Sequence, residues 1–272
     1  MTEPPVSRVE CEDGRRLFGL DPAAYARGRP GYPAELFEIL VERCGLAPGT
    51  PTLEIGPGAG QATAELLARG ANPLTVVEPD ARLAAYIAER FGDGVRVTNA
   101  AFEDASLDRA SFSLAAAATS WHWVDQERGL ARLADALRPG GWWAGWWNVF
   151  HDPAGEPDAL FEALDPILPS PKSAVDSTQH TGAEEFILAR QARFDDLRAS
   201  GFDDVELHEL RWVLALDPQR ARALFGTFSA VLALPSDERE RILGEVEAVI
   251  AERFDGLFER RCVTILYTAL RI

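Results

Sequence analysis

The stretch "LEIGPGAGQATAELLARG", residues 53–70, joins an apolar run to an amphipathic one through three glycines at alternate positions, Gly56, Gly58 and Gly60. The apolar run predicts a buried strand, and the spacing of apolar residues at 61–69 predicts a helix. A turn without Cβ atoms lets the backbone approach a ligand closely, and the helix after it presents free N–H groups. Open α/β sheets bind cofactors at such turns, so this stretch predicts a binding site as well as a fold.

Strand-like and helix-like segments alternate on both sides of the glycine turn. We expect strands at 52–55, 74–78, 95–98, 112–119 and 142–150, and helices at 34–46, 61–69, 80–91 and 127–137. This alternation implies a parallel sheet covered on both faces. Further along, the pattern predicts a helix at 183–199, a strand near 205–216, helices at 218–234 and 236–254, and a last strand at 261–272. The expected α/β fold is doubly wound, with a mostly parallel seven-stranded sheet, an antiparallel edge strand, a helical N-terminal lid and a helical insertion before the last strand.

Composition restricts the ligand and the compartment. The 272 residues can bury a sizeable core, and 43 acidic against 27 basic side chains give a formal charge of −16, which argues against a nucleic-acid partner. The three cysteines share no short spacing, so neither a disulfide framework nor a metal site is expected. No stretch approaches ~18 uncharged apolar residues, and the N-terminus lacks a signal-peptide core. We therefore expect a cytoplasmic protein with a small-molecule ligand and no membrane partner; the oligomeric state is not predicted.

Two acidic residues restrict the class of nucleotide ligand that the turn is expected to bind. Glu78 ends the second expected strand, near the ~20-residue offset at which a carboxylate accepts hydrogen bonds from ribose hydroxyls. The alternative for Glu78 is a solvated acid at a strand end. Glu54 stands within an apolar strand, where an acid is costly unless paired. A dinucleotide fingerprint would need glycine or alanine at Gln61, so a nicotinamide oxidoreductase is disfavoured.

An acid before the turn, alternating glycines and an acid after the second strand resemble the class I S-adenosylmethionine-dependent methyltransferases. VRVTNAAFED (95–104), AAAATSWHWVD (115–125) and LRPGG (137–141) resemble the family's adenine segment, the opening of its active site and the turn before its fifth strand. With YARGRPGYP (25–33), the sequence is most similar to the branch of trans-aconitate methyltransferase-like and natural-product methyltransferases. The resemblance covers roughly residues 20–150 and is only topological beyond. It implies a single Rossmann-like domain over 1–272, with a lid at 1–33 and excursions at 151–181 and 217–256 that cap the acceptor.

The resemblance also implies a set of residues around the cofactor and its product, S-adenosylhomocysteine. Gly56, Gly58 and Gly60 would face the methionine moiety, with Glu54 near its ammonium. Arg29 would meet the methionine carboxylate, and Tyr25 and Tyr32 would close the N-terminal segment over the cofactor, unless this segment is only a surface turn. Ala101 stands where the family often has an aspartate, so adenine recognition is left to backbone groups, Glu103 or Asp104. The remaining implied contacts are Glu78, Pro79, Phe102 and Thr119.

His122 is the candidate catalytic residue. It follows the fourth expected strand, over the sulfonium, and an imidazole can accept a proton from a hydroxyl, amine or indole near neutral pH. Two alternatives stay open: a structural histidine that bonds locally, and catalysis by alignment alone, because the sulfonium is already a strong electrophile.

The tryptophans bear on the methyl acceptor. Trp121, Trp146 and Trp147 are candidates for an aromatic pocket or for cation–π contact with the sulfonium, although a central strand buries most such residues in the core. They favour an aromatic or apolar biosynthetic intermediate of secondary metabolism. The alternatives are a small aconitate-like carboxylate and a cofactor-binding protein of the same fold without methyl transfer. A carboxylate would call on basic residues in or beside the excursion: Lys172, His180, Arg190 and Arg193.

Overall fold

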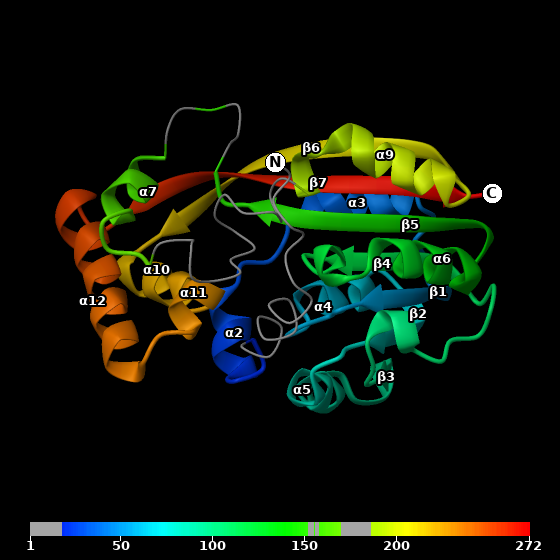
Figure 1. Ribbon diagram of the computed structural model, residues 1–272, viewed down its shortest axis with the longest axis horizontal. Coiled ribbons are helices and arrows are strands. Elements are labelled where there is room, and N and C mark those ends of the chain that lie inside the picture. Colours follow the sequence, from blue (N-terminus) through cyan, green and yellow to red (C-terminus); the bar gives the residue numbers. More distant parts are fainter. Residues whose placement is uncertain (1–17, 152–154, 156–157, 170–185) are drawn as a thin grey trace, which may run out of the picture. The chain divides into compact units, whose positions relative to one another are not determined.

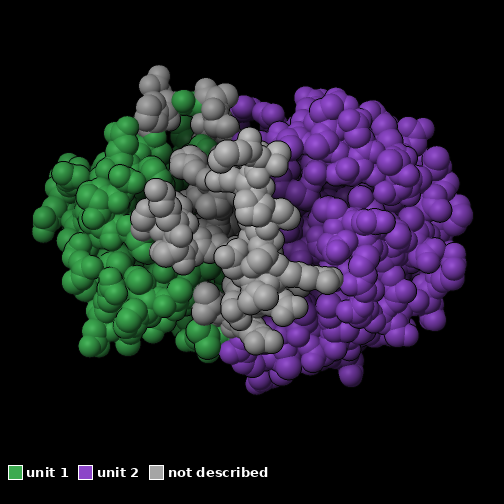
Figure 2. Space-filling model, in the orientation of Figure 1, with its two compact units in different colours: residues 1–30, 150–184, 213–261 green, residues 31–149, 185–212, 262–272 purple. Residues whose placement is uncertain are grey.

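The computed structural model describes residues 18–151, 155, 158–169 and 186–272, and Figure 1 traces them. The chain divides into two compact units (Figure 2): unit 1 comprises residues 1–30, 150–184 and 213–261, and unit 2 comprises 31–149, 185–212 and 262–272. The single domain expected over 1–272 stays a prediction. No helix within the described ranges is long and apolar enough to cross a membrane.

Seven strands form one sheet in the order β3-β2-β1-β4-β5-β7-β6, which confirms the expected α/β fold. Strands β1 to β5 pair in parallel, and β7 pairs antiparallel with β5, from Trp142 opposite Leu270 to Val149 opposite Val263. The predicted antiparallel strand is thus β7, and β6 takes the outermost position. The bounds are β1 Thr50–Ile55, β2 Ala71–Val77, β3 Val95–Thr98, β4 Phe112–Ala118, β5 Leu137–Val149, β6 Phe202–Leu216 and β7 Phe258–Arg271.

Both faces of the sheet in unit 2 are buried, as the parallel strands require. Alternate residues of β4 show this: Ala115 and Ala117 belong to one apolar cluster, and Leu114 and Ala116 belong to the other. Helices α6 (Gln126–Ala136) and α9 (Arg190–Ala199) contribute to the first cluster, and α3 (Ala34–Glu42), α4 (Gln61–Ala68) and α5 (Ala81–Phe91) to the second. Short 3-10 turns lie at η1 Gly92–Gly94, η2 Phe102–Asp104 and η3 Trp121–Trp123.

A buried hydrogen-bond relay runs across the outer strands of unit 2. Trp212 Nε1 donates to Thr264 Oγ1 at 3.0 Å, and Thr264 Oγ1 donates to Asn148 Oδ1 at 2.7 Å. Asn148 Nδ2 in turn donates to the carbonyl oxygen of Gly31 at 3.0 Å. Asn148 and Thr264 face each other across β5 and β7, so the relay ties both strands and β6 to the segment that precedes α3.

Unit 1 collects α2 (Pro22–Gly28), α7 (Ala159–Leu164), α10 (Pro218–Phe225), α11 (Ser229–Leu232) and α12 (Ser236–Arg253). Arg222 joins α10 to α12 through Glu240 at 2.5 Å and Glu247 at 3.1 Å. Gly28 lets α2 approach α10 closely, because a Cβ there would lie 2.3 Å from the carbonyl oxygen of Ala223. Residues 1–30 of the predicted lid and both predicted excursions therefore fall in unit 1, whereas residues 31–33 of the lid fall in unit 2. The capping role of these segments stays a prediction.

Two predicted helices differ from those observed. The helix expected at 218–234 is broken between α10 and α11, where Thr227 Oγ1 donates to the carbonyl oxygen of Leu224 at 2.6 Å and competes with helical bonding. The helix expected at 183–199 is regular only from Arg190, and residues 183–185 lie outside the described part of the chain.

Candidate functional site

The glycine turn follows β1 and has the backbone conformation that its sequence predicts. Gly56, Gly58 and Gly60 have φ angles of +65°, +56° and +86°, the left-handed region that favours glycine. The N–H of Gly56 donates to the carbonyl oxygen of Val77 at 2.9 Å, which joins the turn to the end of β2. Gly60 is the N-cap residue of α4, so the predicted strand–turn–helix unit is confirmed.

Packing within unit 2 also requires two of these glycines. A Cβ on Gly56 would lie 2.6 Å from Cβ of Ser120, and a Cβ on Gly60 would lie 2.5 Å from Cε2 of Phe91. The hydroxyl of Ser120 donates to the carbonyl oxygen of Ile55. The turn thus packs directly against the segment after β4, which brings the glycines and the predicted catalytic segment together at the point where the strand order reverses.

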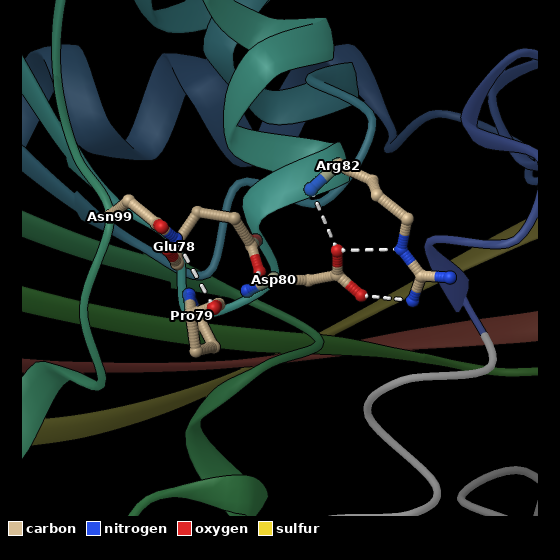
Figure 3. Close-up of polar contacts among 5 residues, drawn as sticks. All are labelled: Glu78, Pro79, Asp80, Arg82 and Asn99. Carbon is tan, nitrogen blue, oxygen red and sulfur yellow. Dashed lines mark hydrogen bonds and ion pairs between the residues drawn. The ribbon is translucent and has the colours of Figure 1, made fainter.

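Glu78 is held in place by backbone donors. Its side chain is buried, with 5% exposed, so the alternative of a solvated acid is wrong. Oε2 accepts the N–H of Gly58 at 3.2 Å. Oε1 accepts the N–H of Asp80 at 3.0 Å, and Figure 3 shows Glu78 and Asp80. Each carboxylate oxygen can accept more than one hydrogen bond, so the oriented carboxylate retains capacity for a ligand's hydroxyls.

Neighbours that the sequence did not single out fix the loop around Glu78. Asn99 Nδ2 donates to the carbonyl oxygens of Glu78 at 2.8 Å and Pro79 at 3.1 Å (Figure 3). Asp80 caps α5 by accepting the N–H of Arg82 at 2.8 Å, and Arg82 Nη2 lies 2.5 Å from Asp80 Oδ2. Hydrogen bonds from Arg82 lower the pKa of Asp80. Asn99 follows the third strand directly, at the carboxyl edge of the sheet, where a polar residue indicates a candidate site residue. The sequence analysis did not single out Asn99.

Glu54 is completely buried beside the turn. Its Oε2 accepts the hydroxyl of Thr63 at 2.7 Å, whereas Oε1 has no hydrogen-bond partner within the described residues. Burial is the main cause that raises the pKa of Glu54 to about 7; the hydrogen bond from Thr63 opposes this rise, and the nearby Glu78 adds to it. An unsatisfied carboxylate oxygen in an apolar interior is costly, so this position suits a cationic group or a water.

The side chains of the predicted adenine-binding segment contact other residues of the protein. Phe102 is buried and packs on Trp121, with ring centroids 5.8 Å apart. Glu103 Oε1 accepts the N–H of Asp125 at 2.8 Å, and Asp104 pairs with Arg128 at 2.6 Å. The adenine contacts expected of Phe102, Glu103 or Asp104 stay predictions.

Thr119 marks the end of β4 with an unusual backbone. Its φ is +56°, a conformation that is rare for a β-branched residue and that clusters at functional sites. Its N–H donates to the carbonyl oxygen of Trp146 at 2.7 Å, and its Oγ1 lies 3.1 Å from the hydroxyl of Tyr32. Tyr32 therefore reaches the carboxyl end of β4 in unit 2, and the cofactor contacts expected of Tyr32 and Thr119 stay predictions.

His122 accepts a hydrogen bond from the indole of Trp147. Trp147 Nε1 donates to His122 Nδ1 at 2.9 Å, which favours the structural alternative, because this bond uses the lone pair that a base would need. Trp121, Trp146 and Trp147 are at most 3% exposed and belong to the core. Their contact with an acceptor stays a prediction.

Tyr25 and Arg29 belong to unit 1. The Arg29 guanidinium carbon lies 5.2 Å from the ring centroid of Phe228, 5.5 Å from that of Tyr25 and 5.9 Å from that of Phe150. Nη2 of Arg29 donates to the carbonyl oxygen of Thr227 at 3.3 Å, and its Nε is buried without a partner in the described chain. The cofactor contacts expected of Tyr25 and Arg29 stay predictions.

The basic residues expected around a carboxylate acceptor are only partly described. Lys172 and His180 lie outside the described residues. The guanidinium carbon of Arg193 lies 3.7 Å above the ring centroid of Phe186, and Nη2 pairs with Asp196 at 2.8 Å. Burial lowers the pKa of Arg193. The remaining candidate, Arg190, lies over the ring of Phe194.

A glycine turn at the switch point of a doubly wound sheet, with a buried acid at the end of the next strand, defines an α/β protein that binds a nucleotide-like cofactor. Residues 52–141 match the family model of the methyltransferase domain. An uncharacterized methyltransferase of Mycobacterium tuberculosis is 27% identical over 243 residues, covering 86% of this chain and 85% of that protein.

Solved structures share the fold. One from Anaeromyxobacter dehalogenans, provisionally described as a type II methyltransferase, has 25% identity and a TM-score of 0.60, over 89% of this chain and 97% of that one. Phosphoethanolamine N-methyltransferase 2 of Haemonchus contortus, solved with S-adenosyl-L-methionine, has a TM-score of 0.56 at 14% identity; the match covers 100% of this chain and 61% of that chain's length. The predicted enzyme class, a methyltransferase, is confirmed by the match of residues 52–141 to the methyltransferase domain and by these relatives. The resemblance to one branch of the family stays a prediction.

Proposed function

We propose that this protein transfers a methyl group from S-adenosylmethionine to a small-molecule acceptor. The observation that carries the proposal is Glu78, a buried carboxylate whose two oxygens are aimed by the N–H groups of Gly58 and Asp80. An acid that follows β2 and lies beside the glycine turn after β1 suits the ribose of an adenosine-containing cofactor.

The residues of the site fit this cofactor. S-adenosylmethionine is the methyl donor, and its sulfonium supplies an electrophilic methyl carbon. Glu78 would hold the ribose hydroxyls, and the unpartnered Oε1 of Glu54 suits the ammonium of the methionine moiety, directly or through water. The glycine turn keeps side chains away from this edge of the sheet, so the backbone itself can meet the ligand.

The acceptor is an aromatic or apolar biosynthetic intermediate. The segment after β4 supports this choice, since Ser120 packs on Gly56 and is followed directly by the aromatic residues Trp121, His122 and Trp123, of which Trp121 is buried in the core. One observation supports the alternative of a small carboxylate: Nε and Nη1 of Arg193 are buried without partners among the described residues. The third possibility is a cofactor-binding protein that does not transfer methyl groups.

Calorimetric titration with S-adenosylhomocysteine, followed by transfer of labelled methyl groups, tests the proposal. The acceptor panel contains phenols, indoles, apolar alcohols and small carboxylates such as trans-aconitate. Labelled product from an aromatic or apolar acceptor supports the proposed substrate class, whereas product from carboxylates alone supports the alternative. Binding without transfer to any acceptor favours the cofactor-binding protein, and failure to bind S-adenosylhomocysteine overturns the proposal.

A further inference from the structure

His122 and Trp147 form a pair whose donor and acceptor are fixed by chemistry. His122 lies on η3, after β4, and Trp147 lies near the end of the neighbouring strand β5. The Trp147 ring is 2% exposed and packs edge-on against Phe186 at 6.0 Å and Tyr267 at 6.2 Å. The indole is therefore held from two sides while its N–H reaches His122 Nδ1 at 2.9 Å.

Only one of the three forms of an imidazole can make this bond. An indole N–H donates and never accepts, so Nδ1 of His122 must carry a lone pair. The imidazolium and the neutral Nδ1–H form both carry a proton there. The remaining form is neutral, with its proton on Nε2, and the hydrogen bond on one ring nitrogen thus sets the tautomer of the other.

We propose that Trp147 is a positioning residue that fixes His122 as the Nε2–H tautomer, so that His122 carries a hydrogen-bond donor on Nε2 and has no lone pair left to take a proton from the acceptor. The part that concerns the acceptor rests on the proposed function. In methyl transfer, a lone pair of the acceptor forms the bond to the methyl carbon, and the electron pair of the carbon–sulfur bond returns to sulfur. His122 takes up no proton in this step. A donor at this place suits an acceptor oxygen that arrives already ionised, as in a carboxylate or an acidic phenol.

Nitrogen NMR of the protein labelled with ¹⁵N-histidine tests the tautomer without any acceptor. His122→Asn assigns the signals of His122 among the four histidines. We expect an unprotonated Nδ1 and a protonated Nε2 in the wild type, and a population of the Nδ1–H form in Trp147→Phe. Trp143→Phe is the matched control, because Trp143 lies on the same strand, is equally buried at 2% and packs on Trp121 at 4.5 Å.

Several results would overturn the proposal. They are an Nδ1–H form in the wild type, an unchanged tautomer in folded Trp147→Phe, or the same change in Trp143→Phe. Circular dichroism checks that the variants fold. If Trp147→Phe does not fold, the nitrogen NMR spectrum of the wild type still decides which tautomer His122 adopts. These outcomes are independent of the proposed function, because no methyl transfer is measured.

The donor role is tested with an acceptor from the panel. The amide nitrogen of His122→Gln can take the place of Nε2–H, so we expect kcat within about tenfold of the wild type and a larger loss in His122→Ala. General bases contribute about 10²- to 10⁴-fold, so a loss of that size in His122→Gln would assign proton transfer to His122 and refute the donor role.

Discussion

Replacing Glu54 with glutamine tests the electrostatics of the glycine turn. The carboxyl of Glu54 is fully buried, and burial raises its pKa from an ordinary 4.5 to about 7. Between these two values the folded protein holds a proton that the unfolded chain has already lost. The free energy of unfolding therefore falls as the pH rises through this window, and the full cost is present above pH 7.

The size of the effect follows from the shift. One pKa unit corresponds to about 1.4 kcal/mol, so the rise from 4.5 to about 7 costs the ligand-free protein about 3 kcal/mol above neutral pH. Glutamine keeps an oxygen for the Thr63 hydroxyl and cannot ionise. Its buried amide has a constant cost at every pH, so the informative quantity is how the stability gap between variant and wild type changes with pH.

Urea unfolding followed by circular dichroism, at about pH 5 and about pH 8 without ligand, measures this quantity. We expect the gap to move by about 2–3 kcal/mol in favour of Glu54→Gln between the two pH values, because at about pH 5 the unfolded chain has already lost most of its proton. Glu38→Gln, on the exposed face of α3, is the control and should leave the gap constant. The same gap at both pH values in Glu54→Gln would refute the burial argument.

Three further predictions follow from contacts around the site and in unit 1. Glu78→Ala should weaken S-adenosylhomocysteine binding by at least roughly 10- to 100-fold in calorimetry, since the loss of one charge-assisted hydrogen bond alone costs about 1.5–3 kcal/mol; unchanged affinity would exclude a ribose contact. Gly56→Ala should lower the free energy of unfolding by more than about 1 kcal/mol, because its Cβ would lie 2.6 Å from that of Ser120, and an equally stable variant would contradict the close packing. Asp158→Asn retains a residue that can cap α7 but removes the charge 2.6 Å from buried Arg260, so a melting curve should show a loss of about 3 kcal/mol; a shift below about 0.5 kcal/mol would make the pair dispensable.

The fold was predictable because its signals are local. Alternating strand and helix patterns repeat along the first half of the chain, and the glycines at 56, 58 and 60 adopt the conformation that their lack of a Cβ permits. The break at Thr227 was not predicted, since the apolar spacing continues through it. In the structure Gly226 is the C-cap of α10, and the Thr227 hydroxyl bonds to the carbonyl oxygen of Leu224.

The candidate site was predictable where the type and position of a residue indicate its chemical role. Glu78 stands at a fixed offset from the turn, and its burial agrees with that expectation. The bond from Trp147 to His122 joins strand β5 to the 3-10 turn η3 across 25 residues of sequence, and no periodicity reports which ring nitrogen faces which indole. Asn99 acts through its side chain on the carbonyls of Glu78 and Pro79, a contact that a pattern of residue types does not encode.

The hydrogen-bond relay from Trp212 through Thr264 and Asn148 to Gly31 affects which segments of this chain can change in sequence and length during evolution. Each of its members stands within three residues of a point where the chain passes between units 1 and 2. Insertions or replacements in 213–261 therefore start from two anchored ends, and those in 150–184 start from one anchored end, at Asn148. The register of β5 against β7 is kept in both cases. Chimaeras that exchange these two segments with those of a relative, and retain the four anchors, should inherit the relative's acceptor preference while keeping their own affinity for the methyl donor.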